Sequence, residues 1–287
     1  MKGKISLIFG AKGYLSPYKL LVSLLATLLC STPVQSKEIP EQSSDTKHWG
    51  GIIASDLWLT GVNANVSNGA RSHAVNANFI DIADKSRRFP LGFSGRFEAH
   101  YDKFAFYIDG NYINVKLKPK FDRFSEGLNI ETGVMDYGLM YRIFGANASE
   151  MLSYQGKQRP VQLDVYAGAR TIWLGIDTTI AGPFGIINRT PTMDKTLTSP
   201  VIGARTGYDF TPNWFVLVNA NIGGFGAQKV ELTSNLVGAV GYRTTAFNMP
   251  VSIEAGYNAL YYKIDKNSPS TVNMWMNGPF LGFTGYW

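Results

Sequence analysis

The stretch FPLGFSGRFEAHY, Phe89–Tyr101, alternates between two kinds of residue. One face of this stretch would hold apolar or aromatic residues and glycine: Phe89, Leu91, Phe93, Gly95, Phe97, Ala99 and Tyr101. The other face would hold Arg96, Glu98 and His100. Because successive side chains of a β-strand point to opposite faces, this period of two predicts a strand with an apolar environment on one side and a polar one on the other.

The same alternation recurs in ten segments along the chain. They cover residues 50–66, 89–101, 103–117, 128–144, 160–178, 199–210, 213–226, 232–246, 249–264 and 273–287. Long connections at 67–88, 118–127 and 179–198 alternate with short ones at 101–103, 210–213 and 247–250, while the connection at 145–159 is long where a short one is expected. This order predicts an all-β chain, an up-and-down antiparallel transmembrane β-barrel of about ten strands, although eight or twelve strands also fit the pattern.

The two faces favour a membrane barrel over a soluble sandwich or a lipocalin-like barrel, in which the apolar face would point inward. Aromatic residues lie toward the ends of the apolar faces, as in the interfacial girdles of membrane barrels. The polar faces carry charges of both signs, and their bases are Arg, which suits crowded, partly desolvated ion pairs. We expect twelve residues to form an ion-pair network in a plugged or very narrow lumen: Asp56, Arg96, Glu98, Asp109, Asp136, Arg142, Asp164, Arg170, Arg205, Asp209, Arg243 and Glu254.

The first 36 residues have the order of a secretory signal peptide. Basic residues precede the apolar run LLVSLLATLLC, Leu20–Cys30, and the small residue Ser36 precedes the expected cleavage site. A lipoprotein signal at Cys30 is disfavoured because Leu29 stands where a small residue is needed. We therefore predict a signal peptide over residues 1–36, a polar linker over 37–48 and the barrel over 49–287.

Removal of this segment changes the charge balance of the chain. The segment holds four of the 27 Lys and Arg residues and no acid, so the mature chain would have 23 basic and 21 acidic residues, a net charge of +2. A nucleic-acid partner, which needs a clustered basic surface, therefore has little support. Cys30 is the sole cysteine of the sequence, so the mature chain would form no disulfide and no cysteine-based metal site.

Five stretches stand out in order: FPLGFSGRFEAHYDKFAFYIDGNYINV, LDVYAGARTIWLGID, SPVIGARTGYDFTPNWFVLVNANIGGFGA, EAGYNALYYKID and GPFLGFTGYW. They resemble a largely uncharacterised family of Gram-negative outer-membrane β-barrel proteins. The resemblance covers nearly all of the mature chain. It implies the barrel fold and the outer membrane, and it brings no activity, cofactor or catalytic residue.

The last of these stretches also resembles the signal that barrel proteins present to the outer-membrane assembly machinery. Leu281, Phe283 and Trp287 match its terminal aromatic residue and alternate apolar positions, while Gly285 stands where a bulky residue is usual. We expect this segment to pair with the first strand and close the barrel, since unpaired backbone groups are costly in lipid. Both termini would then lie in the periplasm, with Trp287 at the inner membrane interface.

The His residues give no catalytic constellation. His100 is expected at the periplasmic end of the second strand, hydrogen-bonded to a carboxylate such as Glu98. The best enzymatic candidate is His73 with Asp81 or Asp84 in the first long connection, although an exposed loop His is the simpler interpretation. No pair of His residues has the spacing of a metal site.

Three functions are compatible with these features. The first is a structural barrel or a narrow passive pore for small solutes. The second is a surface-binding or adhesion barrel that acts through the connections at 67–88 and 179–198, and the third and weakest is an outer-leaflet lipid hydrolase or protease using His73. We expect no enzyme activity and no cofactor.

The expected partners are outer-membrane lipid, lipopolysaccharide and, during biogenesis, the assembly machinery. Basic residues of the outer connections would pair with lipopolysaccharide phosphates, although simple solvation of the loops explains them equally well. These residues are Arg71, Lys85, Arg87, Arg88, Lys118, Lys120 and Arg123.

Overall fold

The computed structural model describes residues 48–68, 71–77, 91–117, 125–147, 150, 157–181, 187–246, 249–264 and 270–287. The chain divides into two units, and the barrel belongs to the unit Lys47–Trp287. The predicted signal peptide and all of the predicted linker except His48 lie outside the described residues. Asp81, Asp84 and six of the seven basic residues expected to bind lipopolysaccharide also lie outside them. These six are Lys85, Arg87, Arg88, Lys118, Lys120 and Arg123.

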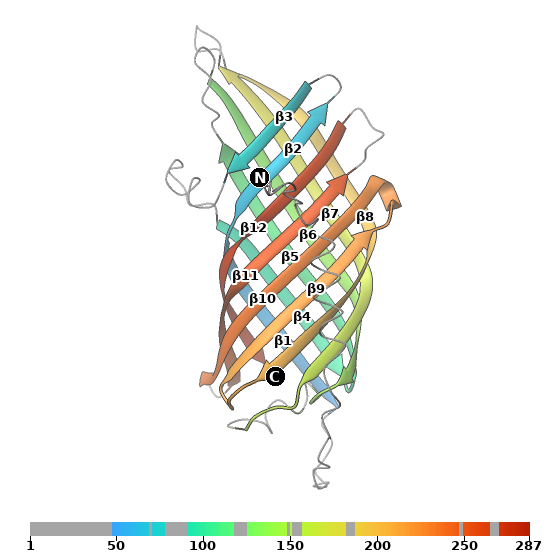
Figure 1. Cartoon of the computed structure of the whole chain (residues 1–287), viewed down its shortest axis with the longest axis vertical. Helices are drawn as coiled ribbons and strands as arrows, with labels where there is room; N and C mark the ends of the chain where they lie inside the picture. Colours follow the sequence, from blue (N-terminus) through green and yellow to red (C-terminus); the bar gives the residue numbers. More distant parts are fainter. Residues whose placement is uncertain are drawn as a thin grey trace, which may run out of the picture. The chain divides into compact units, whose positions relative to one another are not determined.

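The strands form one closed antiparallel barrel (Figure 1). β1 pairs with β4 and β2 with β3, while β1 and β2 follow one another along β12, so twelve segments fill ten positions around the barrel. The predicted all-β, up-and-down barrel of about ten strands is confirmed. The segments are β1 (Trp49–Leu59), β2 (Gly61–Asn68), β3 (Arg71–Ala77), β4 (Leu91–Tyr101), β5 (Phe104–Leu117), β6 (Ser125–Phe144), β7 (Gln162–Ala181), β8 (Ile187–Asp209), β9 (Trp214–Gly224), β10 (Val230–Ala246), β11 (Met249–Ile264) and β12 (Ser270–Tyr286), with the short 3-10 turn η2 (Ala227–Lys229) between β9 and β10.

Within the described ranges, no helix is long and apolar enough to cross a membrane.

One end of the barrel, which we call the short-turn end, holds the tight connections. Asp102 and Lys103 join β4 to β5 there, and residues 210–213 join β8 to β9. The connection between β6 and β7, at residues 145–161, is long, as the sequence pattern indicated.

At the opposite end, which we call the long-strand end, the predicted long connections were wrong in extent. Residues 71–77 form β3 and pair with β2, so His73 lies on a strand rather than in a loop. β6 already begins at Ser125, and β8 begins at Ile187, which pairs with Ala181 of β7. Backbone pairing continues there through segments such as INRTPTMDKT, in which polar residues occupy both faces and the period-two signal is therefore lost.

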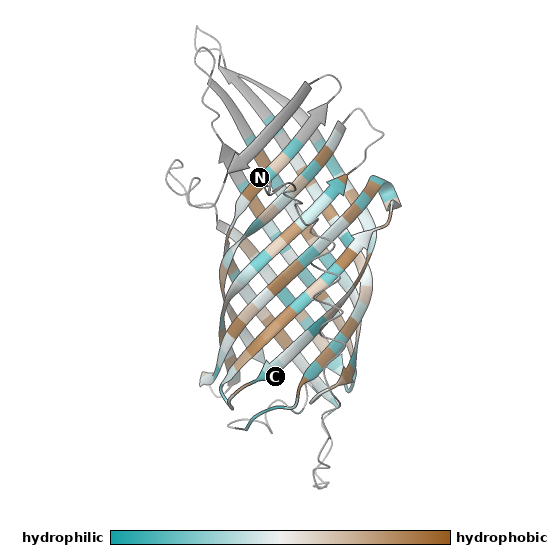
Figure 2. Cartoon of the chain, viewed as in Figure 1, coloured by the Kyte–Doolittle hydropathy of each residue, from teal (hydrophilic) through white to brown (hydrophobic). Residues whose placement is uncertain are grey.

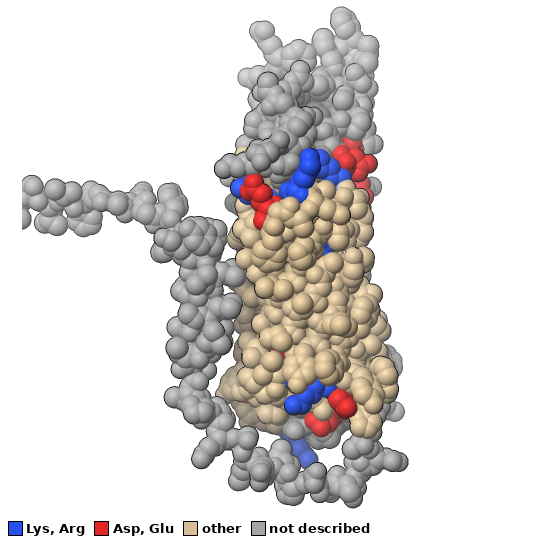
Figure 3. Space-filling view, turned by 90° about the vertical axis from the view of Figure 1, so that its right-hand side faces the viewer, with Lys and Arg blue, Asp and Glu red and all other residues tan. Residues whose placement is uncertain are grey.

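A belt of exposed apolar side chains covers the outside of the barrel. Apolar and polar residues alternate along the strands (Figure 2), and many of the large apolar side chains are exposed on the outer surface. Figure 3 shows the belt as a nearly uncharged zone between two levels at which charged side chains gather. Exposed aromatic residues lie near its edges, with Trp49, Tyr101, Phe104, Tyr141, Tyr208, Trp214, Tyr242 and Trp287 toward the short-turn end and Tyr112, Trp173 and Tyr257 toward the other.

The barrel closes between its first and last strands, as predicted. Ile52 to Trp58 of β1 lie in register with Tyr286 to Phe280 of β12. The pairing extends to the last residue, because the backbone N–H groups of Gly51 and Trp287 donate to each other's carbonyl oxygens at 2.9 and 3.1 Å. A Cβ atom on Gly51 would lie 2.0 Å from Cζ2 of Trp287, so this glycine is what lets the terminal indole lie flat against β1.

Candidate functional site in the barrel lumen

The lumen toward the long-strand end is filled by apolar side chains. Trp58 is fully buried, and its Nε1–H donates to the carbonyl oxygen of Gly278 at 3.1 Å. We call this group the apolar layer: Trp58, Val62, Ala64, Ile113, Ile130, Val134, Ile172, Leu174, Val230, Ala239, Leu260, Tyr262, Ile264, Val272, Met274, Met276 and Phe280. The sequence interpretation missed it, because it treated the inward face as polar along the whole strand.

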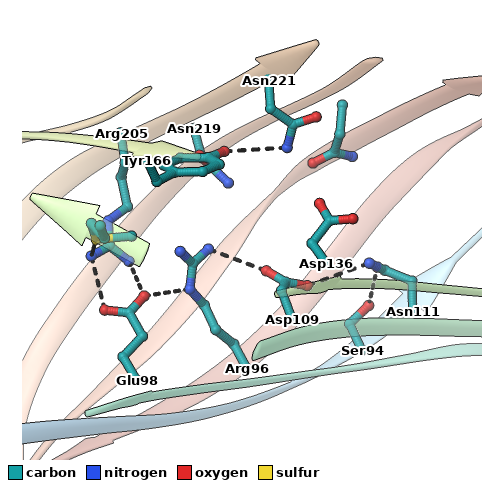
Figure 4. Close-up of polar contacts among 12 residues, drawn as sticks. Ser94, Arg96, Glu98, Asp109, Asn111, Asp136, Tyr166, Arg205, Asn219 and Asn221 are labelled. Carbon is teal, nitrogen blue, oxygen red and sulfur yellow. Dashed lines mark hydrogen bonds and ion pairs between the residues drawn. The ribbon is translucent and has the colours of Figure 1, made fainter. Parts of the chain in front are cut away.

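Below the apolar layer, toward the short-turn end, inward charges form a chain of ion pairs (Figure 4). Arg205 occupies its centre and donates to Oε1 of Glu98 at 2.5 Å and to Oδ2 of Asp164 at 2.9 Å. Both of these carboxylates are fully buried. Each also has a second Arg partner, since Arg96 contacts Glu98 at 2.5 Å and Arg142 contacts Asp164 at 2.7 Å.

A second ion pair joins Arg170 to Asp136. The guanidinium group donates from Nε to Oδ1 at 2.6 Å and from Nη2 to Oδ2 at 2.5 Å, a two-point arrangement that fixes both groups. Its remaining N–H groups reach Thr233 at 2.7 Å and Asn221 at 2.9 Å. The pair therefore links β6 and β7 to β9 and β10.

The structure brings ten of the twelve predicted lumen residues into ion pairs. Beyond those already described, Arg96 contacts Asp109 at 3.1 Å, and Arg243 contacts Asp209 at 2.6 Å. Asp56 and Glu254 also face the lumen, but no ion pair joins either of them to a described residue. Their carboxylates are the exceptions in an otherwise balanced network.

A cavity of about 130 Å³ lies in the lumen, and its wall includes charged residues of the ion-pair chain, Ala239 and Phe280 of the apolar layer, and Arg159 of the β6–β7 connection. Asp56 and Glu254 line it, together with Arg159, which the sequence interpretation left unassigned inside the β6–β7 connection. Burial lowers the pKa of Arg159 to about 10, and repulsion from the nearby Arg243 guanidinium group is the second cause. The backbone N–H of Arg159 donates to Oδ2 of Asp209 at 3.1 Å, which holds this segment at the barrel mouth. An Arg within an over-long connection was the only signal for this residue in the sequence.

The outward apolar belt and the inward ion pairs together decide the class of barrel, because a soluble barrel would place these faces the other way round. The fold is that of an outer-membrane β-barrel.

Comparisons with known proteins found similar chains among solved structures alone. No protein-family model and no curated protein matches the chain. Among solved structures, the outer membrane protease OmpT from Escherichia coli is 10% identical, with 85% of this chain and 100% of that chain covered and a TM-score of 0.46. Ail, the attachment invasion locus protein of Yersinia pestis, is 12% identical, with 83% and 99% covered and a TM-score of 0.32. Neisserial surface protein A is 15% identical, with 82% and 96% covered and a TM-score of 0.27.

The candidate catalytic residues of this outer-membrane β-barrel are not brought together. His100 is buried, and its Nε2 lies 2.7 Å from Oε2 of Glu98, which confirms the expected hydrogen bond. His73 lies on β3, while Asp81 and Asp84 lie outside the described residues. In the part of the chain that the structure describes, no group of three or more His, Cys, Asp or Glu residues is arranged to hold a metal ion.

Proposed function

We propose that this protein is an integral outer-membrane barrel that conducts no solute and acts at the cell surface through the extended outer ends of its strands. The short-turn end would face the periplasm, with both chain termini, and the long-strand end would face outward. The predicted partners, lipopolysaccharide around the barrel and the assembly machinery during insertion, belong to this proposal. The observation that supports this proposal best is the apolar layer that fills the lumen.

The apolar layer argues against a passive pore. Trp58, Tyr262 and Met274 are fully buried at this level, and Tyr262 donates to the Met274 sulfur at 2.9 Å rather than to an open water path. Hydrated ions would have to lose their water shells to pass such a layer, which is strongly unfavourable. Of the two roles combined in the first predicted function, the structural barrel is therefore favoured over the narrow pore.

The length of the strands supports a surface role. A tilted strand needs about 9–11 residues to cross a bilayer. β6, β7 and β8 have 20, 20 and 23 residues, whereas β4 and β9 have 11 each. At roughly 3.3 Å per residue, ten further residues add about 30 Å of paired strand beyond the bilayer. Such an extension is a rigid platform for binding another surface molecule.

Conductance in planar lipid bilayers tests the closed lumen. The wild-type barrel should give no discrete channels, whereas a variant with Trp58, Met274 and Met276 all changed to Ala should conduct, because it thins the apolar layer. Arg205→Ala is the matched control, since it removes a large inward side chain from the ionic level and leaves the apolar layer in place. Discrete wild-type channels, or channels in the control alone, would refute the proposal.

The surface role is tested by shortening one hairpin. Thr178 of β7 and Thr190 of β8 are paired, so residues 179–189 can be replaced by Asn-Gly, a sequence suited to a two-residue hairpin turn. Bacteria that display the wild-type barrel should adhere to protein- or polysaccharide-coated surfaces better than bacteria that display the shortened one. The amount of folded barrel is compared by its heat-modifiable migration in gels. Equal adhesion at equal barrel amounts would contradict a binding role for this hairpin.

A further inference from the structure

The cavity in the lumen, which we call the inner chamber, is a space of molecular size with polar and apolar walls. Its volume of about 130 Å³ is close to that of an engineered cavity of about 150 Å³ that binds benzene, so it has room for about six non-hydrogen atoms. Phe280 of the apolar layer lies along its wall, and Arg159 and Tyr286 lie toward the short-turn end. The other charged side chains along the wall at the ionic level, Arg96, Asp109 and Arg205, are all engaged in ion pairs.

One side of the inner chamber carries uncompensated negative charge. Asp56 on β1 and Glu254 on β11 both lie in register with Gly282 of β12, so their side chains flank a residue that has none. The Asp56 carboxylate leans over this gap, because a Cβ atom on Gly282 would lie 1.9 Å from its Oδ1. Asp56 has no hydrogen bond or ion pair with any described residue, and Glu254 accepts only from Ser252, at 2.7 Å.

A neutral hydroxyl oxygen that can accept a hydrogen bond also lies beside these acids. Thr284 lies two residues after Gly282 on β12, lines the chamber and is 5% exposed. Its side chain makes no hydrogen bond to a residue that the structure describes. The carboxylates of Asp56 and Glu254 are partly buried and lack a cation, which is unfavourable. A bound cationic group with N–H donors would pair with these carboxylates and donate to the Thr284 hydroxyl oxygen.

The other side of the chamber carries uncompensated positive charge. The Nε atoms of Arg159 and Arg243 are buried and have no hydrogen-bond partner among the described residues. Arg243 is paired with Asp209 through Nη1, whereas the Arg159 side chain has only the Tyr286 ring, 5.7 Å from its Cζ. The lowered pKa of Arg159 agrees with a guanidinium group that lacks an anion. Both Arg side chains line the chamber, and a guanidinium group pairs favourably with a carboxylate.

We infer that the inner chamber binds a small zwitterion of amino-acid size, with its carboxylate at Arg159 and Arg243 and its ammonium group at Asp56, Glu254 and Thr284. A simple cation would leave the Arg side unpaired, and a simple anion would leave the two acids unpaired. A molecule that carries both groups satisfies both sides, and the volume limits it to a free amino acid or a similar compound. This site is independent of the proposed surface role.

Isothermal titration calorimetry on the purified full barrel in detergent tests the inference, with L-alanine as the probe and acetate and methylammonium as its two halves. Alanine should bind one per barrel and at least about tenfold more tightly than either half, since one charge-assisted hydrogen-bond set corresponds to a factor of this size. Arg159→Gln and Asp56→Asn should each weaken alanine binding by about tenfold or more. Lys157→Gln, an exposed change two residues from Arg159, is the matched control and should leave the affinity unchanged.

Heat-modifiable migration checks that each variant is folded, and Glu254→Gln replaces Asp56→Asn should the latter fail to fold. Absence of alanine binding to the folded wild-type barrel would overturn the inference. Equal binding of methylammonium or acetate would also overturn it, because the chamber would then be a single-charge site. Retained alanine affinity in both Arg159→Gln and Asp56→Asn would show that binding occurs elsewhere.

Discussion

Replacing Arg170 with Met should lower the free energy of unfolding of the barrel by about 5 kcal/mol, the upper end of the range for breaking a buried ion pair. Arg170 is 1% exposed and donates two hydrogen bonds to the carboxylate of Asp136. No other described cation pairs with Asp136, and the residue opposite it on β5 is another acid, Asp109. Without Arg170, Asp136 would remain buried next to a like charge.

Arg205 makes more ion-pair contacts, yet its removal should cost less, about 3 kcal/mol. After Arg205→Met, Glu98 would keep its pair with Arg96, and Asp164 would keep its pair with Arg142. The structure therefore predicts that the cost follows the carboxylate left without a cation rather than the number of bonds removed.

Urea unfolding of the barrel in phospholipid vesicles, followed by tryptophan fluorescence, measures these differences. The double variant Arg170→Met with Asp136→Asn should recover about 2 kcal/mol or more, because it removes the orphaned charge. Lys263→Met is the surface control: Lys263 pairs with Glu231, both about one-third exposed, and such pairs contribute less than about 1 kcal/mol. A cost for Arg170→Met below that for Arg205→Met, or no recovery in the double variant, would refute the reasoning.

Three further changes test other parts of the barrel. Trp58→Ala should lower the unfolding free energy by about 3–5 kcal/mol in the same urea assay, as expected for a fully buried aromatic residue. Two changes test the assembly signal: Trp287→Ser removes the terminal ring, and Gly51→Leu displaces it. Both should reduce the amount of heat-modifiable barrel found in outer-membrane fractions. Unchanged amounts would count against the assembly-signal prediction. Arg159→Gln should leave stability at pH 7 unchanged or raised, because a folded-state pKa lowered to about 10 means that folding disfavours the charged form at every pH below that value; a marked loss of stability would contradict it.

The sequence identified the barrel because lipid imposes a period-two pattern on every strand that crosses it. Phe93 and Phe97 point outward and Arg96 and Glu98 inward, as the alternation predicted. The alternation no longer identifies a strand where both of its faces meet the same environment. In residues 187–198, polar residues occur at both odd and even positions of the sequence, so this strand was predicted as a connection.

The sequence predicted which charged residues face the lumen, but it did not predict which of them form ion pairs with one another. Alternation placed Asp56 on the same face as the paired acids, yet its isolation depends on Gly282 and on which strands meet across the lumen. The apolar layer was missed for a related reason, since residues such as Met274 and Met276 share the inward face with polar residues farther along β12. Burial by the opposite wall, rather than by sequence neighbours, decides which inward residues are apolar.

The ion pairs solve a problem of register that the apolar pattern leaves open. A slip of one residue between two strands turns apolar side chains into the lumen and is strongly disfavoured, but a slip of two residues keeps every side chain on its proper face. On β6 and β7, Asp136 lies directly opposite Arg170, and six residues farther along, Arg142 lies opposite Asp164 with the signs exchanged. A two-residue slip between β6 and β7 would separate both pairs at once and leave Asp136, Arg142 and Arg170 without ion-pair partners, while Asp164 would keep Arg205. These side chains therefore act as register marks for the long β6–β7 hairpin, which is a role that explains their burial without requiring them to conduct or catalyse.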